Sequence, residues 1–241
     1  MHNVNDRLYP ATSREVNDLE RDTAEFLDGF ADQPDLAHLG GAARRVLATA
    51  AALFYERGAA GTSVRDVTAA CRLSPGALYN HFSSKDDLLY TLVQHGLARM
   101  RRRLDDALAG CSDDPQERFS AFVRAYVVGH LVGPKLAQVT RREYLHLSPE
   151  RCAEVIADRR RFRQELAEIL RMGAKDGVFE LIDGVDDGEP TDGATGQALM
   201  VLDMCSRTSE WFDPHGPSDA DELTERYVRA ARRLVGAHLV S

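Results

Sequence analysis

Residues 62–90, TSVRDVTAACRLSPGALYNHFSSKDDLLY, determine the expected fold more than any other part of the chain. They predict a short helix, a tight turn, a second short helix and the start of a longer third helix. Ser63 is the expected N-cap of the first helix, and Asp66 stands at the spacing of a capping box. Ser74 and Pro75 begin the second helix as N-cap and first helical residue. Two short helices joined by a tight turn are typical of a helix-turn-helix, whose second helix enters the DNA major groove.

The second helix of this segment has one apolar side and one hydrogen-bonding side. Leu78 and Phe82, four residues apart, are expected to face the core. The residues expected to face outward, toward a groove, are small or hydrogen-bonding: Gly76, Ala77, Tyr79, Asn80 and His81. Ser84 and Asp87 repeat the capping-box spacing at the start of the third helix.

The segment from about Ala43 to Leu92 resembles the tetracycline-repressor (TetR) family of bacterial transcription regulators. The resemblance lies in four stretches: FYERG (54–58), TSVRDV (62–67), LYNHF (78–82) and SKDDL (84–88). It implies an all-α fold, with an N-terminal three-helix helix-turn-helix DNA-binding domain and a C-terminal helical domain for ligand binding and dimerisation. It also implies a homodimeric repressor that binds a palindromic operator in double-stranded DNA and is released by a small-molecule effector.

The same resemblance assigns DNA contacts within this segment. The expected phosphate contacts are Thr62, Ser63, Tyr79, His81 and Lys85. The residues expected at the N-terminal end of the reading helix, where backbone N–H groups point toward phosphate, are Ser74, Pro75, Gly76 and Ala77. Asn80 can hydrogen-bond a base edge. Because these positions carry no arginine for guanine, thymine-methyl contacts and DNA shape are expected to supply much of the specificity.

The charge distribution agrees with this assignment, although the net charge of the chain is −8. Residues 41–103 hold ten Lys or Arg against four Asp or Glu, whereas residues 1–40 hold three against nine. Residues 104–241 hold 17 against 25. The basic charge is therefore concentrated in and just after the predicted helix-turn-helix, where it can neutralise phosphates.

The chain is expected to have three parts: an N-terminal extension (1–40), a helix-turn-helix domain (41–90) and an effector-binding and dimerisation domain (91–241). Apolar residues at helical spacing from Ser13 to about Ala31 predict an amphipathic helix. It would pack on its own body or on a dimer mate, and a regulatory arm is the alternative. Strand patterns are absent, and residues 181–193 predict an acidic, glycine-rich loop.

The family resemblance places the effector pocket among the C-terminal helices. Its candidate lining residues are Phe119, Phe122, Tyr126, Tyr144, Arg159, Phe162, Met200, Met204, Arg207 and Trp211. The last two helices are expected to form the dimer interface, with packing inside one subunit as the alternative for each residue. The interface candidates are Leu199, Leu202, Leu223, Tyr227, Ala230, Ala231 and Leu234.

A narrower resemblance concerns the effector. The segments 156–177 and 210–218 are similar to a TetR subgroup that senses acyl-CoA thioesters. The arginines that could meet the phosphates of such a ligand are Arg159, Arg160, Arg161, Arg163 and Arg207. Glu210 stands where the steroid-ring branch of that subgroup has an arginine, so a small aromatic or lipophilic effector stays open. Arg101, Arg102 and Arg103 are interpreted as a solvated helix face.

Two other classes of function are alternatives to a regulator. Glu143-x-x-His146 is half of a carboxylate-bridged di-metal signature, but the sequence holds no second such pair, which disfavours a helical metal-carboxylate enzyme. A helical adaptor that does not bind DNA is disfavoured by the local basic charge. No metal or cofactor is expected. The widely spaced cysteines and the absence of an 18-residue apolar run favour a cytoplasmic protein with no membrane partner.

Overall fold

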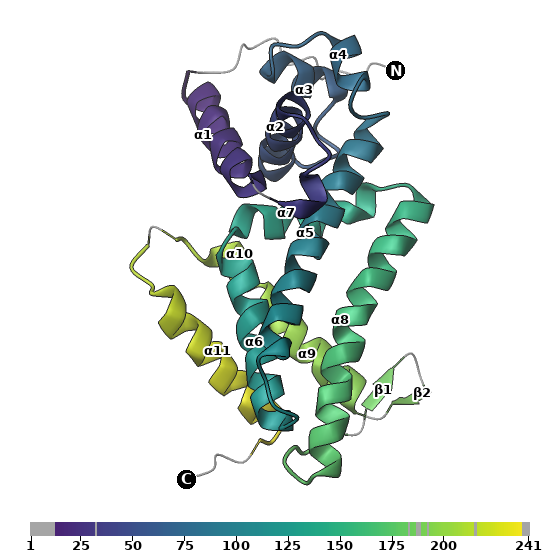
Figure 1. Ribbon diagram of the computed structural model, residues 1–241, viewed down its shortest axis with the longest axis vertical. Helices are drawn as coiled ribbons and strands as arrows, with labels where there is room; N and C mark the ends of the chain where they lie inside the picture. Colours follow the sequence, from purple (N-terminus) through teal and green to yellow (C-terminus); the bar gives the residue numbers. More distant parts are fainter. Residues whose placement is uncertain are drawn as a thin grey trace, which may run out of the picture. The chain divides into compact units, whose positions relative to one another are not determined.

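The computed structural model describes residues 13–31, 33–182, 184–186, 189–191, 193–214 and 216–237 (Figure 1). The fold is all-α, as the sequence predicts. The chain divides into two compact units, one ending at Leu89 and the other beginning at Tyr90. One helix, α5 (Lys85–Ala109), begins in the first unit and continues into the second.

The first unit is built around α2 (Gly41–Arg57), in which every residue from Val46 to Phe54 is buried. This extreme burial arises because α1 (Ser13–Phe30) packs along α2, and α3 (Val64–Ala70) packs against it as well. On α1, Phe26 and Phe30 are buried with ring centroids 6.1 Å apart. The predicted amphipathic helix therefore covers its own body. A 3₁₀ turn at Pro34–Leu36 and the short α4 (Pro75–Tyr79) complete this unit.

The second unit is a helical bundle whose central helix is α6 (Pro115–Leu131). This helix packs against the helices that follow it in the chain, from α7 to α11. After α6 the chain forms α7 (Pro134–Arg142), a 3₁₀ turn (Glu143–His146), α8 (Pro149–Lys175), α9 (Ala194–Ser206), α10 (Thr208–Trp211) and α11 (Ala220–Leu234). Phe119 and Phe122 of α6 are fully buried, as are Leu166 and Leu170 of α8, which packs against α6. Packing on α6 thus holds the bundle together.

Local sequence explains where these helices begin. Asp114, Ser148 and Asp219 accept hydrogen bonds from backbone N–H groups of the first turns of α6, α8 and α11, over 2.8–3.5 Å. Proline is the first residue of α6, α7 and α8, where its missing N–H costs nothing. Each start signal is visible in the sequence.

The buried side chain of Gln197 joins three separate segments of the second unit. Its amide nitrogen donates to the carbonyl oxygens of Glu180 (3.3 Å) and Leu234 (3.1 Å), and its amide oxygen accepts from the N–H of Ile182 (3.3 Å). Gln197 is only 1% exposed. It therefore satisfies backbone groups after α8 and at the end of α11 that would otherwise be buried without partners.

The expectation of a loop at residues 181–193 is wrong in one detail. Strands β1 (Gly184–Asp186) and β2 (Glu189–Thr191) pair there as an antiparallel ribbon, with Val185 opposite Pro190. The sequence between them is Asp-Gly, the dipeptide that most favours a two-residue hairpin connection. The signal was present, but three-residue strands are too short to show an alternating pattern.

Candidate functional site

The helix-turn-helix of the first unit has the caps that its sequence predicts. The Ser63 N–H donates to Asp66 Oδ2 (2.7 Å) and the Asp66 N–H donates to Ser63 Oγ (3.2 Å), which is a capping box. Although partial burial opposes the effect, the hydrogen bonds that the Ser63 hydroxyl (2.6 Å) and N–H donate to the Asp66 carboxyl hold its pKa below the ordinary value. The carboxylate is therefore charged at the N-terminus of α3, where the helix dipole favours it.

The turn between α3 and α4 is tight because Arg72 adopts a left-handed backbone conformation, with φ of 56°. The N–H of Leu73 then donates to the carbonyl oxygen of Thr68 over 2.8 Å. Ser74 restarts the chain as N-cap of α4, accepting from the Ala77 N–H at 3.3 Å. The turn at Arg72-Leu73 thus lies where the sequence predicts it.

The reading helix α4 is short and is fixed by two buried side chains. Leu78 is 0% exposed and Phe82 is 3% exposed. The residues that α4 and its C-terminal end present to solvent are Gly76, Tyr79, Asn80 and His81, with Ala77 half-buried. Tyr79 is 54% exposed, which is a large exposed fraction for an aromatic side chain. This surface has the composition of a DNA-reading face.

The start of α5 differs in a small way from the predicted capping box. The Asp87 N–H donates to Ser84 Oγ (3.0 Å), but the Asp87 carboxylate accepts from the N–H of Ser83 (2.9 Å) rather than from that of Ser84. The cap is therefore one residue wider than a standard capping box.

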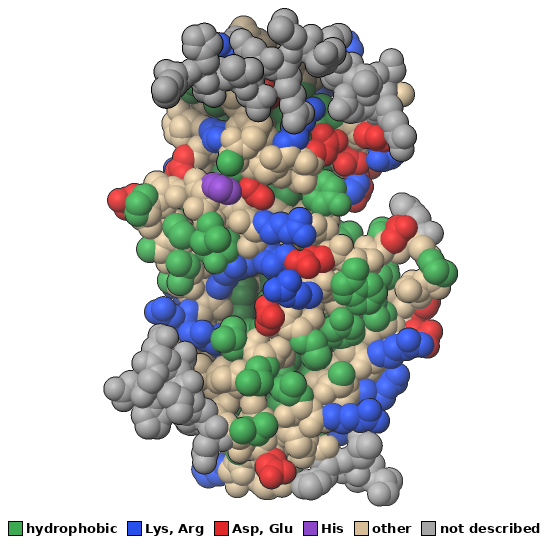
Figure 2. All heavy atoms as spheres, turned by 180° about the vertical axis from the view of Figure 1, so that it is seen from behind, with side chains coloured by type: hydrophobic (Ala, Val, Ile, Leu, Met, Phe, Trp, Pro, Cys, Tyr) green, Lys and Arg blue, Asp and Glu red, His purple; other side chains and the backbone are tan. Residues whose placement is uncertain are grey.

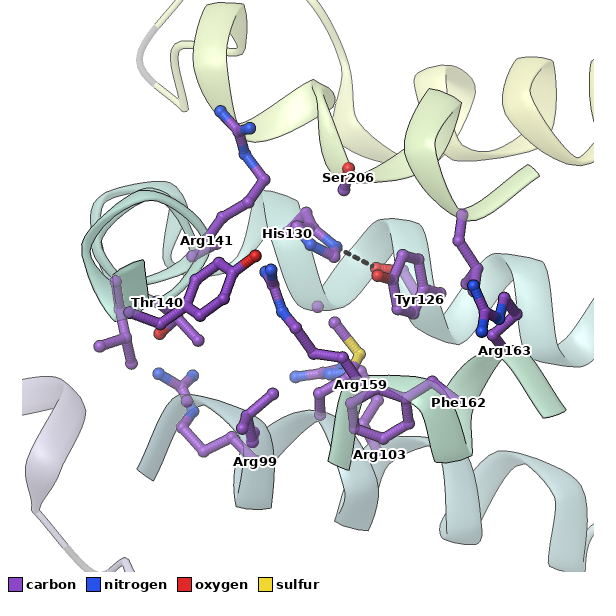
Figure 3. A pocket seen from close by; sticks show the side chains of 18 of the residues that line it. Arg99, Arg103, Tyr126, His130, Thr140, Arg141, Arg159, Phe162, Arg163 and Ser206 are labelled. Atoms are coloured by element: carbon purple, nitrogen blue, oxygen red, sulfur yellow. Dashed lines mark hydrogen bonds between the residues drawn. The ribbon is translucent and has the colours of Figure 1, made fainter. Parts of the chain in front are cut away.

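The second unit contains a cavity of about 460 Å³ between α5, α6, α7, α8 and α9 (Figure 3). Its apolar walls include Leu97, Tyr126, Leu136, Phe162 and Leu202. Glycines let the helices approach closely around it. A Cβ at Gly96 of α5 would overlap Thr140 of α7, and one at Gly129 of α6 would lie 2.6 Å from Met100 of α5.

Six arginines from three helices line this cavity: Arg99, Arg103, Arg141, Arg159, Arg160 and Arg163. Asp203 is the sole acidic residue among the described lining residues. Arg159 extends across the cavity toward His130 (Figure 3) and stacks on the Tyr144 ring, 4.5 Å from its centroid. The Arg163 Nε atom is buried and has no hydrogen-bond partner among the described residues. The cavity therefore has a surplus of positive charge.

One of these arginines is neutralised within the protein. The Arg141 guanidinium forms an ion pair with Glu210 of α10, whose carboxylate also lies 3.5 Å from Arg207 and 3.8 Å from Arg142. Burial lowers the pKa of Arg141, and the charges of Arg142, Arg207 and Arg159 lower it further. Three cations thus compete for one carboxylate beside the cavity.

The cavity also holds a histidine that is kept neutral. His130 Nδ1 lies 2.8 Å from the Tyr126 carbonyl oxygen, which can only accept, so Nδ1 carries the proton. Burial lowers the pKa of His130 to about 4, and the positive charges of Arg159 and Arg141 contribute to this shift. Burial likewise raises the pKa of the neighbouring Tyr126 hydroxyl to about 12. Both rings are uncharged at neutral pH.

Comparison with known proteins decides the family. Residues 46–91 match the family described as "Bacterial regulatory proteins, tetR family", and residues 112–235 match "Tetracyclin repressor-like, C-terminal domain". The second match alone spans just over half of the 241 residues. The chain belongs to the TetR family.

Individual TetR-family relatives agree with this assignment. The chain is 26% identical over 186 residues to the HTH-type transcriptional repressor KstR2 of Mycobacterium tuberculosis, covering 76% of this chain and 87% of that protein. A tetR-family regulatory protein from Rhodococcus RHA1 superimposes with a TM-score of 0.73 at 29% identity, covering 83% and 100% of the two chains. AibR, in complex with isovaleryl coenzyme A and operator DNA, gives 0.67 at 25% identity, covering 82% and 100%.

The protein is therefore a TetR-family transcriptional repressor and not an enzyme, since both matching families consist of regulators. The Glu143-x-x-His146 pair has no metal-site geometry around it: His146 Nε2 lies 3.9 Å from the Glu143 carboxylate, and the described residues hold no group of three or more potential metal ligands. Within the described part of the chain, none of the helices is long and apolar enough to cross a membrane.

Two of the residues expected from the TetR resemblance to contact DNA have internal hydrogen bonds in the structure. Thr62 is 2% exposed and its hydroxyl donates to the Gly58 carbonyl oxygen (2.9 Å), so it is not available to a phosphate. The Lys85 ammonium donates to the carbonyl oxygens of Ala59 (2.8 Å) and Thr62 (3.1 Å), which leaves one of its three N–H groups. Both residues hold the loop before α3, because its backbone carbonyls need donors.

The cavity brings together only part of the predicted effector set. Tyr126, Tyr144, Arg159 and Phe162 line it. The predicted residues that do not line it are Phe119, Phe122, Met200, Met204, Arg207 and Trp211. Phe119 and Phe122 lie on the core side of α6, whereas Met200 and Trp211 are more than half exposed on the outer surface. Helical spacing identified the apolar residues but could not tell core, cavity and surface apart.

Sequence reasoning also missed several cavity residues. Arg103 lines the cavity instead of facing solvent, and Arg101 bonds Glu165 (2.6 Å), so the arginine run on α5 is not simply a solvated face. Arg161, proposed for phosphate, points outward and pairs with Asp158 at 2.7 Å. The sequence did not identify His130 as a cavity residue, because a single histidine on an apolar helix is equally consistent with a place in the core.

The predicted dimer residues fall into two groups. Leu199 lines the cavity and is also 50% exposed, and Leu223, Tyr227, Ala230 and Leu234 are at least partly exposed. Ala231 is fully buried within its own subunit and Leu202 lines the cavity, so these two are corrected to internal packing. Figure 2 shows hydrophobic side chains gathered on one face of the second unit. Met200 and Trp211, at 58% and 53% exposed, are apolar surface residues that the dimer prediction left out.

Proposed function

We propose that this TetR-family repressor binds a palindromic operator as a homodimer and is released by an acyl-CoA thioester bound in the cavity of its second unit. It would act in the cytoplasm, where the operator lies. The observation that carries the effector class is the set of six arginines around a partly apolar cavity with one acidic lining residue.

The arginine set favours a ligand with several negative charges. Bringing like charges together in a partly buried cavity is unfavourable unless an anion joins them. Arg103, Arg160 and Arg163 have no ion-pair partner among the described residues, unlike Arg141, which is paired with Glu210. Phosphate groups match the planar donor geometry of guanidinium well. A neutral aromatic effector would leave these charges unbalanced.

The apolar part of the cavity suits the acyl portion of such a ligand. Tyr126, Leu136, Phe162 and Leu202 provide apolar surface on the same cavity that carries the arginines. A ligand with a charged end and an apolar end therefore satisfies both parts of the wall. The structure of AibR with isovaleryl coenzyme A and operator DNA is a related example, at 25% identity and a TM-score of 0.67.

The DNA-reading role is assigned to α4 and its flanks. The exposed side chains of Tyr79, Asn80 and His81 and the backbone N–H groups of Ser74 and Gly76 supply donors for phosphates and base edges. The Ser63 hydroxyl and N–H both donate to Asp66 Oδ2, so Ser63 supports this surface as a cap of α3. Exposed apolar residues on α9 and half-buried ones on α11 support a homodimer, which would place two such reading helices on the two half-sites of a palindrome.

Release requires that the effector favour a state that does not fit the operator. Five residues of α5 line the cavity, and the same helix begins at the capped end of the helix-turn-helix. A ligand that moves α5 can therefore displace the reading helix, because α5 follows α4 directly in the chain. Full release needs a preference for the released state of about 5.5 kcal/mol.

The test is fluorescence anisotropy with DNA from around the repressor's own gene, titrated with acyl-CoA thioesters, free coenzyme A and free fatty acids. We expect one thioester class to release the operator. Arg163→Gln should weaken this release at least tenfold, whereas Arg161→Gln, two residues away and paired outside the cavity, should not. Release by a free acid alone would replace the thioester with a small lipophilic carboxylate, and equal effects of the two variants would remove the cavity from the mechanism.

The DNA-reading assignment has its own test. Tyr79→Ala should abolish specific operator binding without changing the thermal unfolding temperature, since the side chain is half exposed. Tyr79→Phe separates a hydroxyl contact from a ring contact. Unchanged operator affinity in both variants would remove Tyr79 from the interface.

A further inference from the structure

The cavity contains a hydrogen-bond acceptor among its many donors. His130 is 7% exposed and is one of the lining residues. Its Nδ1–H is committed to the Tyr126 carbonyl oxygen at 2.8 Å, which fixes the tautomer. In the neutral ring, Nε2 is then an acceptor with a lone pair.

Among the described residues, the His130 side chain makes one hydrogen bond, through Nδ1, and its Nε2 atom has no partner. Thr140 of α7 lines the same cavity, and its hydroxyl is buried without a partner in the described part of the chain (Figure 3). Buried polar atoms in folded proteins nearly always have partners. The Thr140 hydroxyl is such a buried atom, and the unpaired His130 Nε2 belongs to a residue that lines the same cavity, so a molecule held in the cavity can partner both.

The chemistry of Nε2 restricts what that partner is. The arginines take anionic oxygens, but a neutral imidazole Nε2 repels them, because both atoms present lone pairs. Burial holds the pKa of His130 at about 4, and Arg159 and Arg141 oppose its protonation. The ring therefore does not become a donor near neutral pH. Only an N–H or O–H group satisfies it.

We propose that His130 accepts a hydrogen bond from an N–H or O–H group of the effector and thereby selects ligands that carry such a donor beside their anionic groups. The inference rests on the proposed function of the cavity as the effector site and goes beyond it. A simple fatty carboxylate has no such donor. An acyl-CoA thioester has such donors in its CoA portion (the amide N–H and hydroxyl groups of the pantetheine arm, the adenine amino group and the ribose hydroxyl), and a further one where the acyl chain carries a hydroxyl group.

The test is isothermal titration calorimetry on the full chain with butyryl-CoA, 3-hydroxybutyryl-CoA and butyrate. The variants are His130→Leu, which removes the acceptor, and His130→Gln, which keeps an acceptor oxygen. The matched control is His146→Leu, because the His146 side chain is 49% exposed and lies outside the cavity. Thermal unfolding confirms that each variant is folded.

We expect His130→Leu to weaken thioester binding about tenfold, the cost of leaving a ligand donor unpaired, and His130→Gln to restore most of it. Equal losses for the two thioesters place the donor in the CoA portion that they share, and a loss confined to 3-hydroxybutyryl-CoA identifies the hydroxyl of the acyl chain. Wild-type affinity in His130→Leu would overturn the inference while the effector class stands. Failure of the wild type to bind either thioester would overturn the effector class and this inference with it.

Discussion

Replacing Lys85 by methionine separates two roles for this residue. The Lys85 ammonium donates to the Ala59 and Thr62 carbonyl oxygens at 2.8 and 3.1 Å, in the loop between α2 and α3. Methionine keeps the apolar stem of the side chain and removes both bonds. The structure therefore predicts that Lys85→Met destabilises the fold, whereas a residue used only for phosphate would affect DNA binding alone.

The size of the effect follows from the bonds that are lost. A hydrogen bond to a charged group contributes about 1.5–3 kcal/mol when well buried. Lys85 is half-buried, so solvent screens part of this, and the two bonds together should contribute roughly 2 kcal/mol. For a chain of this length, 1 kcal/mol lowers Tm by about 2–4 °C. The expected decrease in Tm is thus about 4–8 °C.

The assay is thermal unfolding by circular dichroism, combined with operator titrations at several salt concentrations. Lys175→Met, at the exposed C-terminal end of α8, is the control and should leave both unchanged. A pure phosphate contact would instead reduce the slope of log affinity against log salt by about 1 without moving Tm. That pattern would refute the structural role assigned to Lys85.

Three further changes test the second unit. Gly96→Ala should weaken effector binding, because the new methyl group overlaps Thr140 at the cavity wall; equal affinity by calorimetry would show that α7 moves aside freely. Gln197→Leu should lower the free energy of unfolding by about 3 kcal/mol in urea titrations, since three backbone groups lose a buried partner; a change below about 1 kcal/mol would contradict this. Because the pKa of His130 is lowered from 6.5 to about 4 in the folded state, its contribution to stability is lost as pH falls from 6.5 toward 4, by up to about 3 kcal/mol. His130→Phe should therefore flatten the stability profile between pH 7.5 and 5, and an unaltered slope would refute the shift.

The helix-turn-helix was readable in the sequence because its information is local. Ser63 and Asp66 cap a helix through contacts three residues apart, and Leu78 and Phe82 define a buried face at a spacing of four. Such patterns depend on helix geometry alone. The capping partners of the longer C-terminal helices, such as Asp114 and Asp219, belong to the same local class.

The cavity could not be read in this way, because it depends on which helices become neighbours. Arg103 on α5 and Arg163 on α8 reach one cavity although 60 residues separate them in the chain. Phe122 and Tyr126 share an apolar face of α6, yet Phe122 enters the core and Tyr126 lines the cavity. Helical periodicity gives the buried side of a helix but not what it is buried against. The internal roles of Thr62 and Ala231 escaped prediction for the same reason.

The anchoring of α4 has a consequence for how the protein can evolve. A five-residue helix has no stability of its own in water, and α4 is held in place by Leu78 and Phe82. Its exposed positions, including Gly76, Tyr79 and Asn80, add little to that packing. The residues that keep the repressor folded and those that choose its operator are therefore different residues. Mutation can explore new operators at the exposed positions with little loss of stability, so duplicated copies of such a gene can diverge in their targets while inheriting one scaffold.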